Sequence, residues 1–225
     1  ELPPEGQWTY EEFVESLKKL TSEEGKRGTE NVYGINGYID LGCYNISGLL
    51  MVDGARFIDD NGNYAFNGPE ALKGLTKLYE LKHVHKVTHP QFGEMNKEEA
   101  LMSFLQGKSA VLMADAWMVP YIRNMAGKYN VEFTVAGYPV GDSELPLYMN
   151  NTYLSYGVFK QSDPNKIKAC VDFIKYITDK SFTEELANLG YFSPRKSGDL
   201  LYIEDEEMQR ISISLNYAEP LPKNK

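Results

Sequence analysis

The sequence predicts an α/β fold, a mixed sheet covered by helices, because short apolar runs alternate along the 225 residues with longer stretches of helical spacing. The run "SAVLMA" at 109–114 is apolar on both faces, as strands are when helices cover both sides of a sheet. The stretch "SDPNKIKACVDFIKYITDK" at 162–180 has a capping aspartate, a first-turn proline and an apolar stripe, which are typical of an amphipathic helix.

The first helix is predicted directly after Thr9, which can form a capping box with Glu12 while Trp8 packs on Phe13. Its expected buried face consists of Phe13, Leu17 and Leu20. A short strand is expected in "VYGINGYI" at 32–39, where glycines bound an apolar run.

The middle of the chain predicts a hairpin and two helices. Asn61-Gly62 is typical of a hairpin turn. A helix is expected at 69–83, with one apolar face made of Leu72, Leu75 and Tyr79. The next helix is capped by Asn96 with Glu99 and ends at Gly107. Its expected inward residues are Leu101, Phe104 and Leu105.

After the strand at 109–114, a helix is expected within a few residues of Trp117, because Pro120 is tolerated only in a first turn. Further strands are expected at 132–140 and 152–159. The last three helices are predicted after Asp163, from Ser181 to Gly190, and within 203–215. Their expected inward residues include Ile167, Val171, Ile174, Ile177, Met208, Ile211 and Leu215.

The charge balance argues against nucleic acid as a partner. Lys and Arg total 23 against 32 Asp and Glu, so the formal net charge is −9 and the chain has no basic cluster. No apolar run approaches the roughly 20 residues that cross a bilayer. Cys43 and Cys170 lie far apart in unlike contexts, and two unpaired thiols are expected.

Catalytic and metal motifs are missing from the sequence. Adjacent acidic residues fall in helix first turns or in a turn, and there is no nucleophile elbow or phosphate-binding glycine loop. His83, His85 and His89 are expected at a solvated helix end rather than around a metal. We therefore expect no enzyme activity, no metal and no cofactor.

Trp117 is the most suggestive single residue. It follows a buried strand, and ligands of α/β sheets collect beyond the carboxyl ends of strands. Its indole face could pack on a pyranose ring while Asp115 accepts hydrogen bonds from hydroxyl groups. Core packing would give the same pattern, so position alone leaves both interpretations open.

The order of several motifs resembles a known family. "WTYEEFVESLKKLT" at 8–21 is similar to the motif with which the second lobe opens in bacterial extracellular solute-binding proteins of the sugar-binding family that includes maltodextrin-binding protein. "VYGI", "NGPEALKGLTKLYELK", "EEALMSFLQGKSAVLMADAW", "GYPVG" and "SDPNKIKACVDFIKYITDKSFTEELANLGYFSPR" follow in the family's order. The segment around Gly107-Lys108 and Trp117 is the most specific part.

The resemblance implies a periplasmic-binding-protein-like (type II) lobe together with part of the other lobe. Residues 1–150 and 193–225 would form the second, C-terminal lobe, and 151–192 would belong to the first. The signal peptide, the N-terminal part of the first lobe and some of the tail would be missing from this sequence. Such a piece is expected to fold, to bind sugar weakly or not at all, and to be open to self-association.

The resemblance also implies ligand-binding residues. Trp117 matches the family's stacking tryptophan, and Tyr38 and Tyr44 lie where the family often places another aromatic residue. Residues of the second and third crossings between lobes are further candidates: Asn150, Asn151, Tyr153 and Arg195.

The implied function is the substrate-binding component of an ABC importer, which takes a carbohydrate, such as an oligosaccharide, into an interlobe cleft and delivers it to a membrane permease. Such a protein works outside the cytoplasmic membrane, in the periplasm or as a cell-surface lipoprotein whose anchor is its only membrane contact. The alternatives are a binding protein for a polyamine or ferric ion, since fold alone does not set the ligand, and a carbohydrate-active enzyme.

Overall fold

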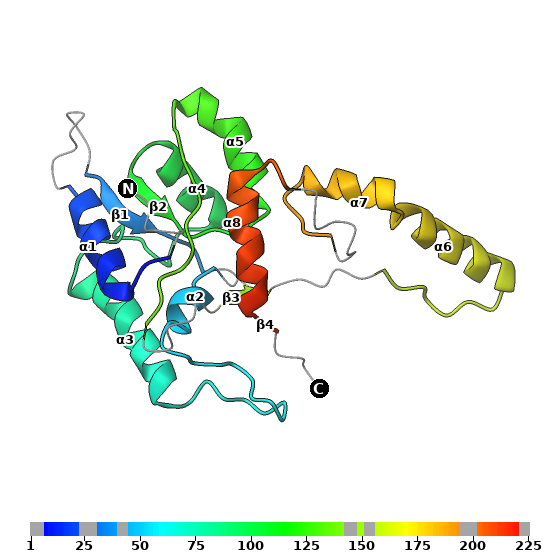
Figure 1. Ribbon diagram of the computed structural model, residues 1–225, viewed down its shortest axis with the longest axis horizontal. Coiled ribbons are helices and arrows are strands. Elements are labelled where there is room, and N and C mark those ends of the chain that lie inside the picture. Colours follow the sequence, from blue (N-terminus) through cyan, green and yellow to red (C-terminus); the bar gives the residue numbers. More distant parts are fainter. Residues whose placement is uncertain are drawn as a thin grey trace.

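The computed structural model consists of a compact body and a helical arm that extends from it (Figure 1). The body contains the N-terminal half of the chain and the last helix, and the arm contains α6 and α7. The structure describes residues 7–22, 31–39, 45–141, 148–150, 156–193 and 202–220.

A parallel pair of strands lies in the body. β1 (Tyr33–Asn36) pairs with β2 (Ser109–Leu112), with Tyr33 opposite Ser109. The pair continues past β1 through a bridge between Ile35 and Thr88. The α/β expectation is confirmed, although the described strands form two parallel pairs rather than one mixed sheet.

Four helices of the body follow the local signals of the sequence. They are α1 (Tyr10–Leu20), α3 (Pro69–His83), α4 (Lys97–Leu105) and α5 (Met118–Tyr129). Two of the predicted capping boxes are present, from Thr9 to Glu12 before α1 and from Asn96 to Glu99 before α4. α2 (Ser47–Leu50) is a single turn with all four residues buried.

The body has three apolar clusters. The largest packs α1 on β1, α2 and α3, and it includes Phe13, Leu17, Ile35, Leu49 and Leu81. A second joins α4 to α5 through Leu101, Leu105, Met118 and Ile122. The third packs α8 (Glu206–Ser214) on α5 through Val119, Tyr202 and Met208. The turn η3 (Leu215–Tyr217) follows α8.

A second parallel pair joins two distant segments of the chain. β3 (Tyr148–Asn150) pairs with β4 (Ala218–Pro220), which follows η3. The sequence predicted neither strand, because three residues are too few to show a period.

The arm consists of α6 (Pro164–Ile177) and α7 (Lys180–Ala187). Asp163 caps α6 and Pro164 opens it, as predicted. None of the residues of α6 is buried, although Ile174 and Ile177 are partly covered. The predicted start of α7, with Ser181 as the cap and Glu184 as its capping-box partner, was wrong: the helix begins after Asp179, which makes no side-chain cap hydrogen bond, and Ser181 lies inside the helix. Gly190 adopts a left-handed backbone conformation after this helix, with φ at +80°.

The predicted inward face of α3 was wrong. Leu72, Leu75 and Tyr79 are 65%, 48% and 60% exposed, whereas Ala71, Gly74 and Leu81 are buried. A Cβ atom on Gly74 would lie 2.0 Å from the carbonyl oxygen of Leu50, so the missing side chain is what lets this face approach α2. Leu20 and Leu215 are also exposed, contrary to expectation.

The strand predicted at 132–140 does not form. This segment runs beside the chain before α1 and makes only one bridge, between Thr9 and Val140. The indole N–H of Trp8 donates to the carbonyl oxygen of Gly137 at 2.9 Å. Of the strand predicted at 152–159, residues 156–159 are not in a strand and the others lie outside the described residues.

Candidate functional site

Trp117 lies in the turn between β2 and α5. Asp115 and Ala116 accept hydrogen bonds from the backbone N–H groups of Met118 and Val119, so the chain turns directly from the strand into the helix. Trp117 is the residue before α5 and is partly exposed, with part of its ring on the cluster between α4 and α5. The residue therefore lies beyond the carboxyl end of a parallel strand, where α/β sheets hold ligands.

The side chain of Lys97 lies over the ring of Trp117. Its Nζ atom is 5.1 Å from the ring centroid, within the range of a cation–π interaction. Lys97 is the first residue of α4, and the capping box between Asn96 and Glu99 fixes that end of the helix with bonds of 2.9 and 3.0 Å. A hydrogen-bond donor thus lies over the indole ring.

Asp115 adds a partly buried carboxyl group to the same turn. Its Oδ2 accepts a hydrogen bond from the hydroxyl group of Tyr38 at 3.2 Å. Burial raises the pKa of Asp115, and hydrogen bonds from Tyr38 and Trp117 and the charge of Lys97 oppose that rise. The carboxyl group is held by donors on two sides, and it can accept further hydrogen bonds through its remaining lone pairs.

The sequence matches the profile of a family described as bacterial extracellular solute-binding protein over residues 3–210. The chain belongs to this family of binding proteins. A comparison with curated protein sequences gave no match.

Solved structures of solute-binding proteins share the fold. A maltose/maltodextrin-binding domain from Bdellovibrio bacteriovorus, bound to maltotriose, superposes with a TM-score of 0.73 at 16% identity, covering 99% of this chain and 57% of its own. Maltose-bound MalE3 of T. maritima superposes with a TM-score of 0.72 at 21% identity, and the match covers 96% of this chain and 55% of MalE3. A solute-binding protein from Agrobacterium radiobacter in complex with ribitol superposes with a TM-score of 0.63 at 25% identity, and the match covers 97% of this chain and 54% of that protein.

The likeness identifies the fold as a lobe of the type II periplasmic-binding-protein class. This chain spans about half the length of the solute-binding proteins that it matches.

The structure brings three of the predicted site residues together: Trp117, Asp115 and Tyr38. Tyr38 is 0% exposed, and its hydroxyl group also lies 3.4 Å from the sulfur of Met118. The second core cluster encloses the ring of Tyr38, so a ligand contact of this residue stays a prediction. In this structure the hydroxyl group of Tyr38 donates to the carboxyl group of Asp115.

The other predicted site residues cannot be placed at this turn. Asn150 is in β3, which the structure describes only by its backbone. Four candidates lie outside the described residues: Tyr44, Asn151, Tyr153 and Arg195.

Two neighbours of Trp117 were not predictable from the sequence. The sequence did not single out Lys97 and marked Gly190 only as a helix stop, although both contact Trp117. No local signal could have found them, because each contact joins segments that are distant in the chain.

A cavity of about 300 Å³ lies away from this turn. It includes Lys108, which precedes β2, whereas Trp117 follows that strand. Its other lining residues come from α4, from Gln106 at the end of that helix and from the segment between α3 and α4, and they include His89, Met95 and Met102. Trp117 and Asp115 do not line it.

Within the described residues, no group of three His, Cys, Asp or Glu side chains could hold a metal ion. His83 stacks on Tyr79 with ring centroids 4.3 Å apart, and His89 packs edge-on against Tyr33 at 5.0 Å. Cys170, on α6, is a free thiol, and Cys43 lies outside the described part of the chain. None of the described helices has the length and apolar character that a membrane crossing needs.

Proposed function

We propose that the chain is part of the substrate-binding component of an ABC importer and that it binds a carbohydrate at Trp117. The observation that carries the proposal is a partly exposed indole beyond the carboxyl end of β2, with Lys97 over its ring and the carboxyl group of Asp115 beside it. In this proposal the chain binds its ligand without chemical conversion and uses no cofactor.

This combination of groups suits a polyhydroxylated ligand. The C–H face of a sugar ring packs on an aromatic face, while its hydroxyl groups need both donors and acceptors. Lys97 supplies a donor and Asp115 an acceptor beside the indole. Ligands named for the structural neighbours, which include maltotriose, maltose and ribitol, support the same class of ligand.

We further propose that a longer protein supplies the other wall of the site. The matched structures are nearly twice as long as this chain, and α6 has no buried residue here. In this proposal residues 1–150 and 193–225 form one lobe, whereas 151–192 pack on the first lobe. Delivery to a permease, and a place in the periplasm or on the cell surface with a lipid anchor as the membrane contact, belong to the same proposal.

To test this, both tryptophans of the chain are replaced by 5-fluorotryptophan, and a titration with maltotriose is monitored by ¹⁹F NMR. If one wall supplies about half of a micromolar binding energy, the dissociation constant falls near the millimolar range. The Trp117 signal should move on titration and the Trp8 signal should not.

Trp117→Ala, followed by ligand-observed NMR, should weaken maltotriose binding by about 1–3 kcal/mol without a similar loss of stability. Trp8→Phe is the matched control, because Trp8 packs on Phe13 away from the proposed site and should leave binding unchanged. Equal affinity of the Trp117→Ala variant and the parent chain would remove the indole from the site.

Three other measurements test the competing functions. The chain is also titrated with spermidine, with ferric citrate and with a panel of sugars. If spermidine or ferric citrate moves the Trp117 signal and the sugars do not, the ligand is not a carbohydrate. Release of nitrophenol from chromogenic glycosides would contradict the proposal that the protein only binds.

A further inference from the structure

Gly190, in the turn after α7, is in close contact with the backbone of Trp117. A Cβ atom built on Gly190 would lie 2.7 Å from the Cα of Trp117 and 3.0 Å from both the oxygen of Ala116 and the Cδ of Pro120. Contacts under 3.0 Å are not tolerated, so any side chain here would displace the turn that carries the indole. The left-handed backbone of Gly190, with φ at +80°, favours glycine for a second reason.

Tyr202 holds the Gly190 turn in place. Its hydroxyl group lies 2.7 Å from the carbonyl oxygen of Tyr191 and 3.0 Å from that of Ala187, so its single hydrogen can donate to the residues on either side of Gly190. Its ring packs edge-on against Phe192 at 5.1 Å. Burial is the main cause that raises the pKa of Tyr202 to about 12, so the hydroxyl remains a donor at neutral pH.

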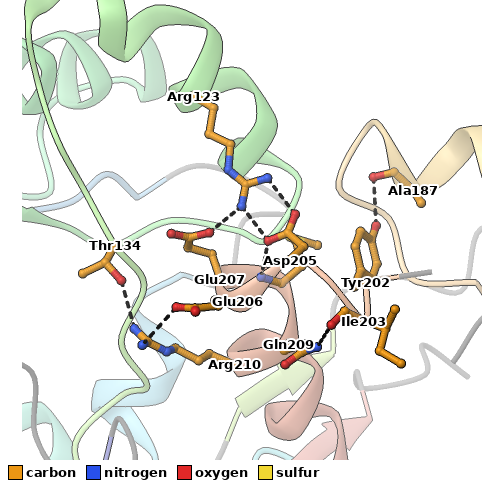
Figure 2. Close-up of polar contacts among 11 residues, drawn as sticks. Arg123, Thr134, Ala187, Tyr202, Ile203, Asp205, Glu206, Glu207, Gln209 and Arg210 are labelled. Atoms are coloured by element: carbon orange, nitrogen blue, oxygen red, sulfur yellow. Dashed lines mark hydrogen bonds and ion pairs between the residues drawn. The ribbon is translucent and has the colours of Figure 1, made fainter. Parts of the chain in front are cut away.

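Tyr202 is in turn fixed to α5 through the cap of α8 (Figure 2). The backbone N–H of Asp205 donates to the carbonyl oxygen of Tyr202 at 2.9 Å. Arg123 of α5 donates to both carboxylate oxygens of Asp205, at 2.7 and 2.6 Å, and to Glu207 at 2.7 Å. Asp205 also caps α8 by accepting from the backbone N–H of Met208 at 3.0 Å.

These contacts form a closed ring that begins and ends on α5. From Arg123 the ring passes through Asp205 and Tyr202 to the Gly190 turn, and it returns to α5 at Trp117, the residue before the helix. The Gly190 turn is also the end of the arm, because it directly follows α7. The Gly190 turn therefore connects the end of the arm with the backbone that carries the indole of Trp117.

We infer that Gly190 and Tyr202 are positioning residues for Trp117: they set the place of the indole against which the ligand packs, without touching the ligand. The expected effect on ligand binding rests on the proposed function, whereas the effect of Gly190 and Tyr202 on the position of Trp117 does not. Through this turn, a change in the position of α7 reaches Trp117.

The test uses the 225-residue chain labelled with 5-fluorotryptophan, in which Trp8 is the internal reference. Gly190→Ala should shift the ¹⁹F signal of Trp117 and leave that of Trp8 in place. Tyr202→Phe keeps the ring on Phe192 and removes only the hydroxyl group, so it should produce a smaller shift of the same signal. It also keeps the test open if Gly190→Ala does not fold.

Gly62→Ala is the matched control. Gly62 has nearly the same backbone φ, +82°, but a Cβ there would meet no atom within 4 Å. This variant carries the backbone cost of a left-handed alanine without the contact with Trp117, and it should shift neither signal.

Maltotriose binding by the Gly190 and Tyr202 variants should weaken by roughly 2- to 30-fold, as expected for residues that act through another residue. Unchanged Trp117 signals in both variants would overturn the inference, as would equal shifts in the Gly62 variant. If the parent chain shows no response to sugars while the Gly190 variant still shifts Trp117, the positioning role stands and the proposed ligand fails.

Discussion

Two helices with the same local signals have opposite environments in this protein. α1 and α6 each begin with a side-chain cap, from Thr9 and Asp163, and each has an apolar stripe along one side. α1 buries Tyr10, Phe13, Val14 and Leu17, whereas α6 buries no residue. The capping contacts lie within a few residues of each helix start, but burial depends on a partner surface.

The difference separates the signals that form a helix from those that place it. In the body, α1 packs on β1, α2 and α3, so its apolar side contributes to a closed core. In the arm, Phe173 and Tyr176 are 61% and 68% exposed. The apolar surface of the arm is therefore available to another polypeptide, as the proposed two-lobed protein requires.

Core substitutions should give the largest difference between the two regions. Leu17→Ala, at a 0% exposed position of α1, should lower the free energy of unfolding by about 2–5 kcal/mol, because it leaves a cavity. Val171→Ala, at a 37% exposed position of α6, should cost about 0.5 kcal/mol or less. Urea unfolding followed by circular dichroism measures both. Equal losses would mean that α6 is packed in solution.

Self-association should show the second difference. We expect the chain to associate at high concentration through the arm, and Phe173→Ser with Tyr176→Ser to weaken that association by about 1–3 kcal/mol. Leu72→Ser with Tyr79→Ser removes a similar exposed area from α3 of the body and is the matched control. Sedimentation velocity over a range of concentrations distinguishes them. A monomer at every concentration, or an effect confined to the α3 variant, would be evidence against the arm.

Ion pairs should show the smallest difference. Arg123→Gln should cost about 1 kcal/mol or less after solvent screening, because its bidentate pair with Asp205 is only partly covered. Lys168→Gln breaks the exposed pair with Asp172 on α6 and should leave the urea midpoint unchanged within error. The same urea unfolding measurement, made at pH 7, compares the two variants.

The ion pair of the body should also be sensitive to acid. Arg123 lowers the pKa of Asp205 in the folded protein below its ordinary value of about 3.9. A lowered folded-state pKa means that the stabilisation is fully present above about pH 4 and is lost as the pH falls through the folded value. The gap in stability between the parent chain and Arg123→Gln should therefore close below pH 4. A gap that stayed constant with pH would show that the guanidinium acts by packing alone.

Much of the secondary structure was predictable because its determinants are local. The capping box from Asn96 to Glu99 and the Asp163-Pro164 start lie within one turn of the helices they open, so the residue order alone specifies them. The same is true of the adjacency of Asp115 and Trp117 at the end of β2, which the sequence placed correctly. The family to which the chain belongs was also predictable, from the order of motifs over nearly the whole chain.

Only the tertiary structure decided which faces are buried and what surrounds Trp117. Leu72 and Tyr79 look like the inward side of α3 by hydrophobicity, yet Gly74 faces inward because only a residue without a side chain allows the close approach to Leu50. The contacts of Lys97 and Gly190 with Trp117 join segments that are far apart in the chain, and nothing in their local sequence specifies them. Local hydrogen bonds determined the helices, whereas long-range packing determined the site.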